Sequence, residues 1–160
     1  MKIISGGLTG VDRAALDVAI KLNIEHGGWC PKGRIAEKGG IIPLHYQLEE
    51  TKSSNYEVRT KLNIEDADGT LIIVPDVEEA LTDGTALTLD YAKKIAKPHL
   101  VVDARDKTIS SEHILEWLQE NVIVILNVAG PRESKSPGIY ERTCELLDFT
   151  FNKISNTCES

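Results

Sequence analysis

The residues best suited to bind a ligand lie near the start of the chain and are Ser5, Gly6, Gly7, Thr9 and Gly10. A short apolar run precedes them, and a helix-like apolar pattern over residues 11–22 follows. Glycines allow a tight turn and bring backbone N–H groups close to a ligand, while the start of a helix carries partial positive charge. The stretch therefore predicts a binding site for a phosphate or a similar anion. The alternative is a strand-to-helix turn that binds nothing.

A second candidate segment is the Gly/Pro-rich loop over residues 27–43, which holds the cations Lys32 and Arg34. Long irregular loops in compact domains are more often functional than merely connecting. A pair of cations there would suit a second anionic group on the ligand. The same two residues could instead be ordinary surface charges. Cys30 has no base beside it in the sequence, so we do not expect it to act as a nucleophile or a metal ligand.

The helix expected over residues 56–66 carries Arg59 and Asn63, four residues apart and therefore on one face. If this face points into a cleft, the two side chains can hold a polar ligand. If it points outward, they are ordinary surface residues. Ser54 or Asn55 is the expected cap of this helix.

Two further strand ends carry glycine together with hydroxyl, amide or cationic side chains. These candidates are Gly84, Thr85, Thr88, Asn127, Gly130 and Arg132. The first three open a helix whose free N–H groups would form another anion site, although a plain helix cap explains them too. Because ligands of parallel α/β sheets bind beyond the carboxyl ends of the strands, we expect all these turns to converge on one hollow.

The apolar pattern predicts an α/β fold with an open, mostly parallel sheet and helices on both faces. Buried strands are expected at residues 1–5, 70–74, 99–103 and 122–128, with a weaker, short or bulged strand at 24–30. Helices are expected at residues 11–22, 56–66, 85–96, 111–120 and 139–154, with Ser110 and Ser111 as candidate caps of the fourth. No linker or repeat divides the chain, so we expect a single domain over residues 1–160.

Composition narrows the function classes. The net charge of −7 disfavours a nucleic-acid partner, which usually meets a basic face. No apolar run approaches the length of a membrane span and no signal peptide is evident, so we expect a cytoplasmic protein without a membrane partner. The three cysteines and the four histidines lack metal-ligand spacing, which indicates reduced thiols and no protein-ligated metal.

Several strings resemble the molybdenum carrier family. They are Ser5-Gly6-Gly7-Leu8-Thr9-Gly10-Val11-Asp12-Arg13, Gly28-Trp29-Cys30-Pro31-Lys32-Gly33-Arg34, residues 51–63, Asp68-Gly69-Thr70-Leu71-Ile72, and Asn127-Val128-Ala129-Gly130-Pro131-Arg132-Glu133-Ser134. The resemblance covers nearly the whole chain. It implies a Rossmann-like fold and a carrier of a phosphorylated small molecule, with molybdenum cofactor or a related nucleotide as the candidate ligand. It also implies a homo-oligomer.

The resemblance extends to a superfamily that includes lysine-decarboxylase-like phosphoribohydrolases. In those enzymes a catalytic Glu occupies the position that matches Thr88 here, and a threonine cannot replace a carboxylate in N-glycosidic cleavage. Leu8 also departs from the family, in which a Gln is usual. Two alternatives therefore remain beside the carrier. One is a phosphoribohydrolase-like enzyme acting on a nucleotide or ADP-ribose-like ligand, with Glu57 or Asp83 as the carboxylate, and the other is a nucleotide-sensing regulatory module.

Overall fold

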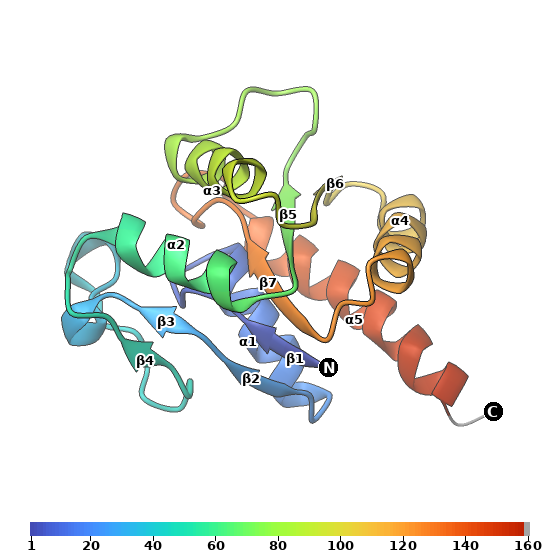
Figure 1. Cartoon of the computed structure of the whole chain (residues 1–160), viewed down its shortest axis with the longest axis horizontal. Helices are drawn as coiled ribbons and strands as arrows, with labels where there is room; N and C mark the ends of the chain where they lie inside the picture. The colour runs from blue at the N-terminus through green and yellow to red at the C-terminus, as the bar shows by residue number, and fades with distance from the viewer. Residues whose placement is uncertain (159–160) are drawn as a thin grey trace.

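The protein is built around a five-stranded sheet with the strand order β2-β1-β7-β5-β6. The computed structural model describes residues 1–158, apart from the side chains of residue 83 and residues 155–158. The strands are β1 (Lys2–Ile4), β2 (Glu25–Gly27), β5 (Gly69–Val74), β6 (His99–Asp103) and β7 (Ile125–Ala129). Every neighbouring pair is parallel. The fold is therefore the Rossmann-like α/β arrangement expected from the sequence (Figure 1).

Five helices connect or follow the strands: α1 (Val11–Lys21), α2 (Tyr56–Asp66), α3 (Asp83–Lys94), α4 (Lys107–Glu120) and α5 (Ile139–Cys158). Helix α5 packs against both α1 and α4, and α2 packs against α3. Helices α1, α4 and α5 therefore form one layer, while α2 and α3 cover the opposite face of the sheet (Figure 1). Helices on both faces leave the carboxyl edge of the sheet open for a site.

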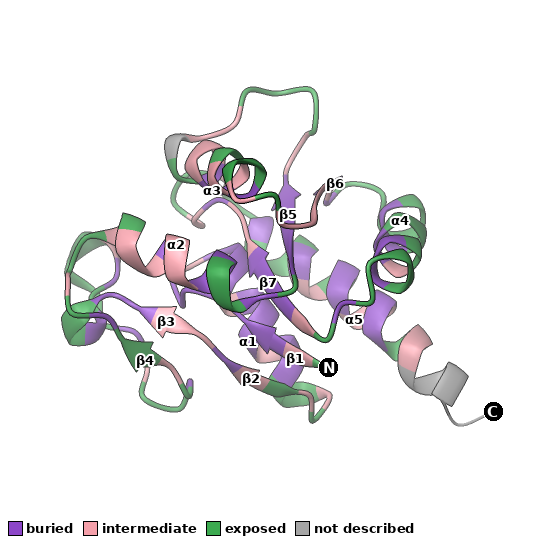
Figure 2. Cartoon of the chain, in the orientation of Figure 1, coloured by how far each residue is buried: buried purple, intermediate pink, exposed green. Residues whose placement is uncertain are grey.

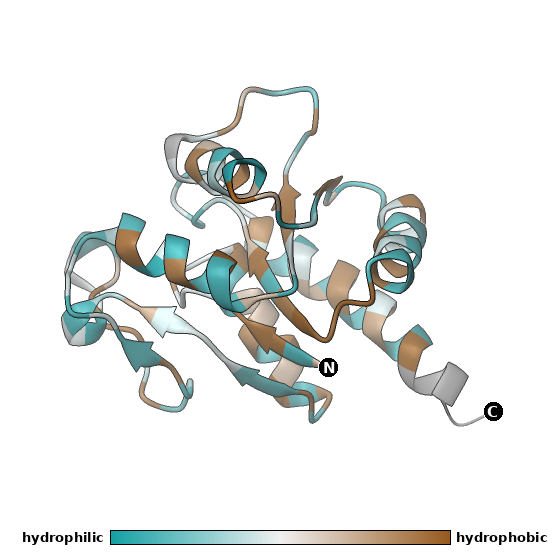
Figure 3. Cartoon of the chain, viewed as in Figure 1, coloured by the Kyte–Doolittle hydropathy of each residue, from teal (hydrophilic) through white to brown (hydrophobic). Residues whose placement is uncertain are grey.

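The core follows from the alternation of buried strand residues. Leu71 and Ile73 of β5 join the large apolar cluster under α1, α4 and α5, while Ile72 and Val74 are also buried and alternate with them. A strand buried on both faces reads as a continuous apolar run, which is why this strand was evident from sequence. Figures 2 and 3 show the buried and hydrophobic segments coinciding along β1, β5 and β7.

Three helix starts, at residues 11, 56 and 139, agree with the prediction, whereas the strand expected at residues 122–128 begins three residues later, at Ile125. Helix α4 begins at Lys107, and Asp106 caps it by accepting a hydrogen bond from the Ile109 N–H. The prediction that Ser110 and Ser111 cap this helix was wrong, because both lie buried inside it. Asn55 does cap α2, through the Glu57 N–H. Helix α3 begins two residues before the expected position.

The weak strand expected at residues 24–30 is divided in two. β2 ends at Gly27, and β3 (Trp29–Cys30) forms a separate two-stranded sheet with β4 (Glu49–Glu50). Gly28 between them has φ +124°, and a Cβ there would overlap the backbone of Ser5. Only glycine fits this close approach, so the chain leaves the main sheet here. In the part of the chain that the structure describes, no helix combines the length and apolarity that a membrane crossing needs.

Candidate functional site

A cleft of about 500 Å³ lies at the carboxyl edge of the sheet, between α2, α3 and the turns that follow β1 and β7. Its charged lining residues are Asp12, Glu57, Arg59, Arg132 and Lys135. The hydroxyl groups of Thr60, Thr82, Thr85 and Thr88 also line it, as do the apolar Leu8, Leu87, Ala129 and Pro131, together with Tyr56, Gly84 and Gly130. Polar groups on partly apolar walls are typical of a small-molecule site, and the volume falls within the usual range.

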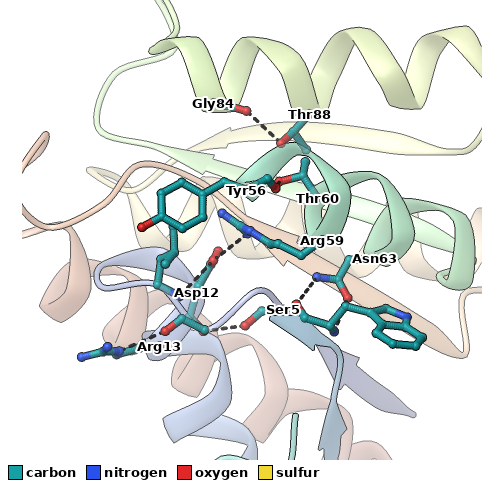
Figure 4. A network of polar contacts seen from close by, with 12 residues as sticks. Ser5, Asp12, Arg13, Tyr56, Arg59, Thr60, Asn63, Gly84 and Thr88 are labelled. Atoms are coloured by element: carbon teal, nitrogen blue, oxygen red, sulfur yellow. Dashed lines mark hydrogen bonds and ion pairs between the residues drawn. The ribbon is translucent and has the colours of Figure 1, made fainter. Parts of the chain in front are cut away.

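An ion pair forms one end of the cleft (Figure 4). The Arg59 guanidinium, from α2, lies 3.2 Å from Asp12 Oδ2, measured from Nη1. Gly6 makes room for it, because a Cβ at Gly6 would overlap the guanidinium. The Tyr56 ring lies 5.9 Å from Arg59 Cζ. The first glycine turn is therefore shaped around a cationic side chain from another element.

The Asp12 carboxyl is unusual in its environment. Burial raises its pKa to about 6, against the opposing effects of Arg59 and of a hydrogen bond from the Leu8 N–H. Glu37, in the short turn η2 (Glu37–Gly39), adds a like charge that also raises the pKa of Asp12. Both hydrogen bonds to this carboxyl go to Oδ2. Among the described residues, none donates a hydrogen bond to Oδ1.

The first turn of α3 forms the facing wall. Thr82 precedes the helix and donates its hydroxyl to Thr85 Oγ1, while Thr88 donates its hydroxyl to the Gly84 carbonyl. Thr85 and Thr88 are buried and Gly84 is exposed, with open space around its Cα. Backbone N–H groups of a helix start have no intrahelical acceptor, so this turn can donate to an anion in the cleft.

The turn after β7 completes the cleft and is tied to the first glycine turn. Thr9 Oγ1 accepts a hydrogen bond from the Glu133 N–H, and the Val11 N–H donates to the Pro131 carbonyl. Gly10 has φ +82°, and a Cβ there would overlap the Pro131 carbonyl oxygen. Because the two turns touch, Arg132 and Lys135 reach the same cleft as Asp12.

The predicted site residues therefore fall into three groups. Arg59, Gly84, Thr85, Thr88, Gly130 and Arg132 line the cleft. Ser5, Gly6, Gly7, Thr9 and Gly10 build the turn beneath it, and Lys32, Arg34, Asn63 and Asn127 lie elsewhere. The expected convergence thus holds for three of the glycine turns, and the loop of Lys32 and Arg34 is not among the cleft-lining segments.

The side chains of Arg34 and Asn63 form hydrogen bonds within the protein and do not point into the cleft. The buried Arg34 guanidinium donates to the carbonyls of Ile42, Pro43, Tyr46 and Leu48 and so holds the long loop together. The Asn63 amide donates to the Trp29 carbonyl and accepts from its N–H.

The other two predicted residues outside the cleft are Asn127 and Lys32, and they differ in burial. Asn127 is buried and donates to Thr70 Oγ1, while the Lys32 side chain is exposed.

Sequence reasoning did not select Asp12, Tyr56, Thr60 or Lys135 as site residues, although each lines the cleft. Asp12 looked like an ordinary acid in the first turn of a helix. Its position could have indicated a role in the site. Asp12 directly follows the glycine turn, so a side chain on the inner face of α1 lies there at the carboxyl edge of the sheet.

A larger hollow, about 650 Å³, lies beside β6 and α4. It contains none of the predicted site residues, and its cation, Arg105, is paired with Asp76 and Asp103. The cleft between α2 and α3 is therefore the better candidate site.

The fold and the cleft define a Rossmann-like α/β protein with a polar hollow at the carboxyl edge of its sheet. The profile of the circularly permutated YpsA SLOG family matches residues 3–151, so the chain belongs to that family. It is also similar to a crystal structure from Syntrophus aciditrophicus SB described as "Putative molybdenum carrier protein", with 48% identity over 93% of each chain and a TM-score of 0.88. No curated protein matches the chain. The family resemblance noted in the sequence is thereby confirmed.

Proposed function

We propose that this protein binds a phosphorylated small molecule in the cleft between α2 and α3 and serves as its carrier. Molybdenum cofactor or a related nucleotide is the candidate ligand. The name of the similar protein from Syntrophus aciditrophicus SB supports a carrier role. A cytoplasmic location and a homo-oligomeric state belong to the same proposal, and light scattering of the purified protein tests the latter.

The observation that carries the proposal is the meeting of cations and a helix start around one hollow. Arg132 and Lys135 line the cleft beside the first turn of α3, where Gly84 and Thr85 offer backbone N–H groups. A phosphate placed between them gains charge-assisted hydrogen bonds from both sides. The apolar Leu8, Leu87 and Pro131 leave room for the body of a ring-containing ligand.

Molybdenum cofactor is compatible with this lining through its phosphate and its ring. In the described part of the chain no group of three or more His, Cys, Asp and Glu side chains is arranged to hold a metal. Cys30 is buried and is not among the cleft-lining residues. The protein would therefore hold such a cofactor through its organic part, by polar contacts and burial.

Thermal unfolding and calorimetry with GMP, AMP, inorganic pyrophosphate, a pterin phosphate and molybdate test the proposal. A ligand that binds only the native state must raise the melting temperature. In K135Q we expect an affinity about 10-fold lower than in the wild type, because the variant loses a charge-assisted contact with the phosphate. K94Q removes the same charge from an exposed position in the last turn of α3 and is the matched control. Absence of any shift at millimolar phosphorylated ligand would refute the proposal.

A phosphoribohydrolase-like enzyme is the second candidate, because Glu57 lines the cleft. The side chain of Asp83, the other expected carboxylate, lies outside the described residues. Thr88 lines the cleft, so the position that matches the catalytic Glu of those enzymes carries no carboxylate here. In such a reaction the C–N glycosidic bond breaks, water adds its oxygen to the sugar carbon, and the free base takes a proton. Release of base from a nucleoside monophosphate, lost in E57Q, would favour this enzyme over the carrier.

A further inference from the structure

We propose that Asp12 determines which ligands the cleft accepts, by receiving a hydrogen bond from an N–H group on the edge of the ligand's ring, next to a ring acceptor that Arg59 serves. The class selected is a ring with an amide-like or amidine-like edge, in which a donor and an acceptor are adjacent. This inference rests on the proposed function and adds the part of the ligand that lies away from the phosphate.

The first support is a free acceptor in a buried side chain. The Asp12 side chain is only 5% exposed and lines the cleft. Its Oδ2 accepts from Leu8 N–H at 3.3 Å and from Arg59 Nη1 at 3.2 Å. No described residue donates to Oδ1. Among the described residues, Oδ1 is not one of the fully buried atoms without a partner, so a donor from a ligand in the cleft can reach it and form a charge-assisted hydrogen bond.

The second support comes from the partner residue. The Arg59 side chain is 13% exposed and its Nη1 contacts Asp12, while no described residue accepts a hydrogen bond from Nη2, which is not among the fully buried atoms. An unpaired donor therefore lies beside an unpaired acceptor, and the ion pair holds the two groups together. An edge that offers one acceptor and one donor satisfies both, whereas a ring without a donor leaves Asp12 unpaired.

The negative charges around Asp12 disfavour binding of the phosphate at this end of the cleft. Glu37 from η2 adds a second negative charge near Asp12, and Glu57 of α2 lines the same cleft. Arg59 from α2 is the cation paired with Asp12, and the other cations that line the cleft are Arg132 and Lys135 from the turn after β7. A phosphate beside Asp12 would meet a like charge. Next to Arg132, Lys135 and the start of α3 it would not.

The test compares two nucleotides of nearly the same shape. Inosine 5′-monophosphate carries an N–H and a carbonyl on its six-membered ring, and purine riboside 5′-monophosphate has neither. At pH 7.5 we expect calorimetry to give at least about 10-fold tighter binding of the inosine nucleotide. In D12N the amide oxygen must face the Leu8 N–H and Arg59, so its NH₂ points into the cleft and the free acceptor becomes a donor. The preference should then fall to within about twofold, while D90N, an exposed position on α3, retains it.

The pH dependence of binding provides a second test, because a purely structural role of Asp12 would not change it. Because the pKa of Asp12 is raised to about 6, its carboxyl gains a proton below that pH and ceases to be an acceptor at Oδ1. Binding of the inosine nucleotide should weaken between pH 7.5 and 5.5 in the wild type and change much less in D12N. Circular dichroism and the melting temperature of D12N verify that it is folded.

Each outcome decides the matter. Equal affinity for the two nucleotides, or tighter binding at low pH, would overturn the role of Asp12. A melting shift with pyrophosphate but with neither nucleotide would leave the proposed function intact and refute this inference. No shift with any phosphorylated ligand would refute both.

Discussion

Replacing Asp12 by asparagine should change how the stability of the ligand-free protein depends on pH. The folded carboxyl has a pKa of about 6, against 3.8 for the ordinary group, because burial disfavours its charged form. The folded state therefore binds a proton more tightly than the unfolded chain. The resulting stabilisation is fully present below pH 3.8 and is lost as the pH rises through 6.

The magnitude follows from the size of the shift. A difference of about two pKa units corresponds to about 3 kcal/mol in total. Linkage places about 2 kcal/mol of this between pH 4.5 and 7.5, which is a convenient range for urea unfolding. The amide side chain introduced in D12N cannot titrate, so the free energy of unfolding of D12N minus that of the wild type should rise by about 2 kcal/mol across this range.

The slope with pH is the informative quantity. Any weakening of the contact with Arg59 in D12N adds a nearly constant amount at every pH, and taking the change between two pH values removes it. D90N controls for the loss of one negative charge, because Asp90 is exposed on the surface of α3. A difference between D12N and wild type that is flat, or that falls with rising pH, would show that Asp12 is not the buried carboxyl described here.

Three further substitutions test the framework of the site, each by urea unfolding. G10A should cost about 2–3 kcal/mol, since φ is +82° and a Cβ would overlap the Pro131 carbonyl; a loss below about 1 kcal/mol would contradict this packing. R34M should cost about 3 kcal/mol and expose the loop over residues 31–48 to protease, because four carbonyls lose their donor, and unchanged proteolysis would count against that role. N63L should cost about 2 kcal/mol by leaving the Trp29 backbone groups unpaired, whereas K61Q, on the same helix, should stay within about 0.5 kcal/mol of wild type.

The strands and most helices could be predicted because their signals are local. The run from Gly69 to Val74 is apolar at nearly every position since both faces of β5 are covered, and this shows in the sequence itself. Gly28 shows the limit of such signals. The weak strand was expected to be short or bulged, but its division depends on the approach of Ser5, which is distant in sequence.

The candidate site divides in the same way. Its glycine turns were evident because the α/β fold brings strand ends to one edge, and Gly84, Thr85, Gly130 and Arg132 do share a cleft. The role of Arg34 could not be predicted from sequence. A cation on a glycine-rich loop can bind an anionic ligand or can bind carbonyl groups of its own loop, and the sequence pattern is the same in both cases. In the structure the Arg34 guanidinium donates to four carbonyls between Ile42 and Leu48, so its role is to stabilise the loop.

By itself the sequence determined the α/β class, the parallel strands and the glycine turns, because periodicity and backbone freedom are properties of neighbouring residues. Only the tertiary structure decided which polar side chains have partners. Asp12 and Arg59 are 47 residues apart, and their pairing over Gly6 exists because two helices on opposite faces of the sheet meet at its edge. Burial, charge and unpaired atoms are set by such distant contacts, and they give the cleft its chemistry.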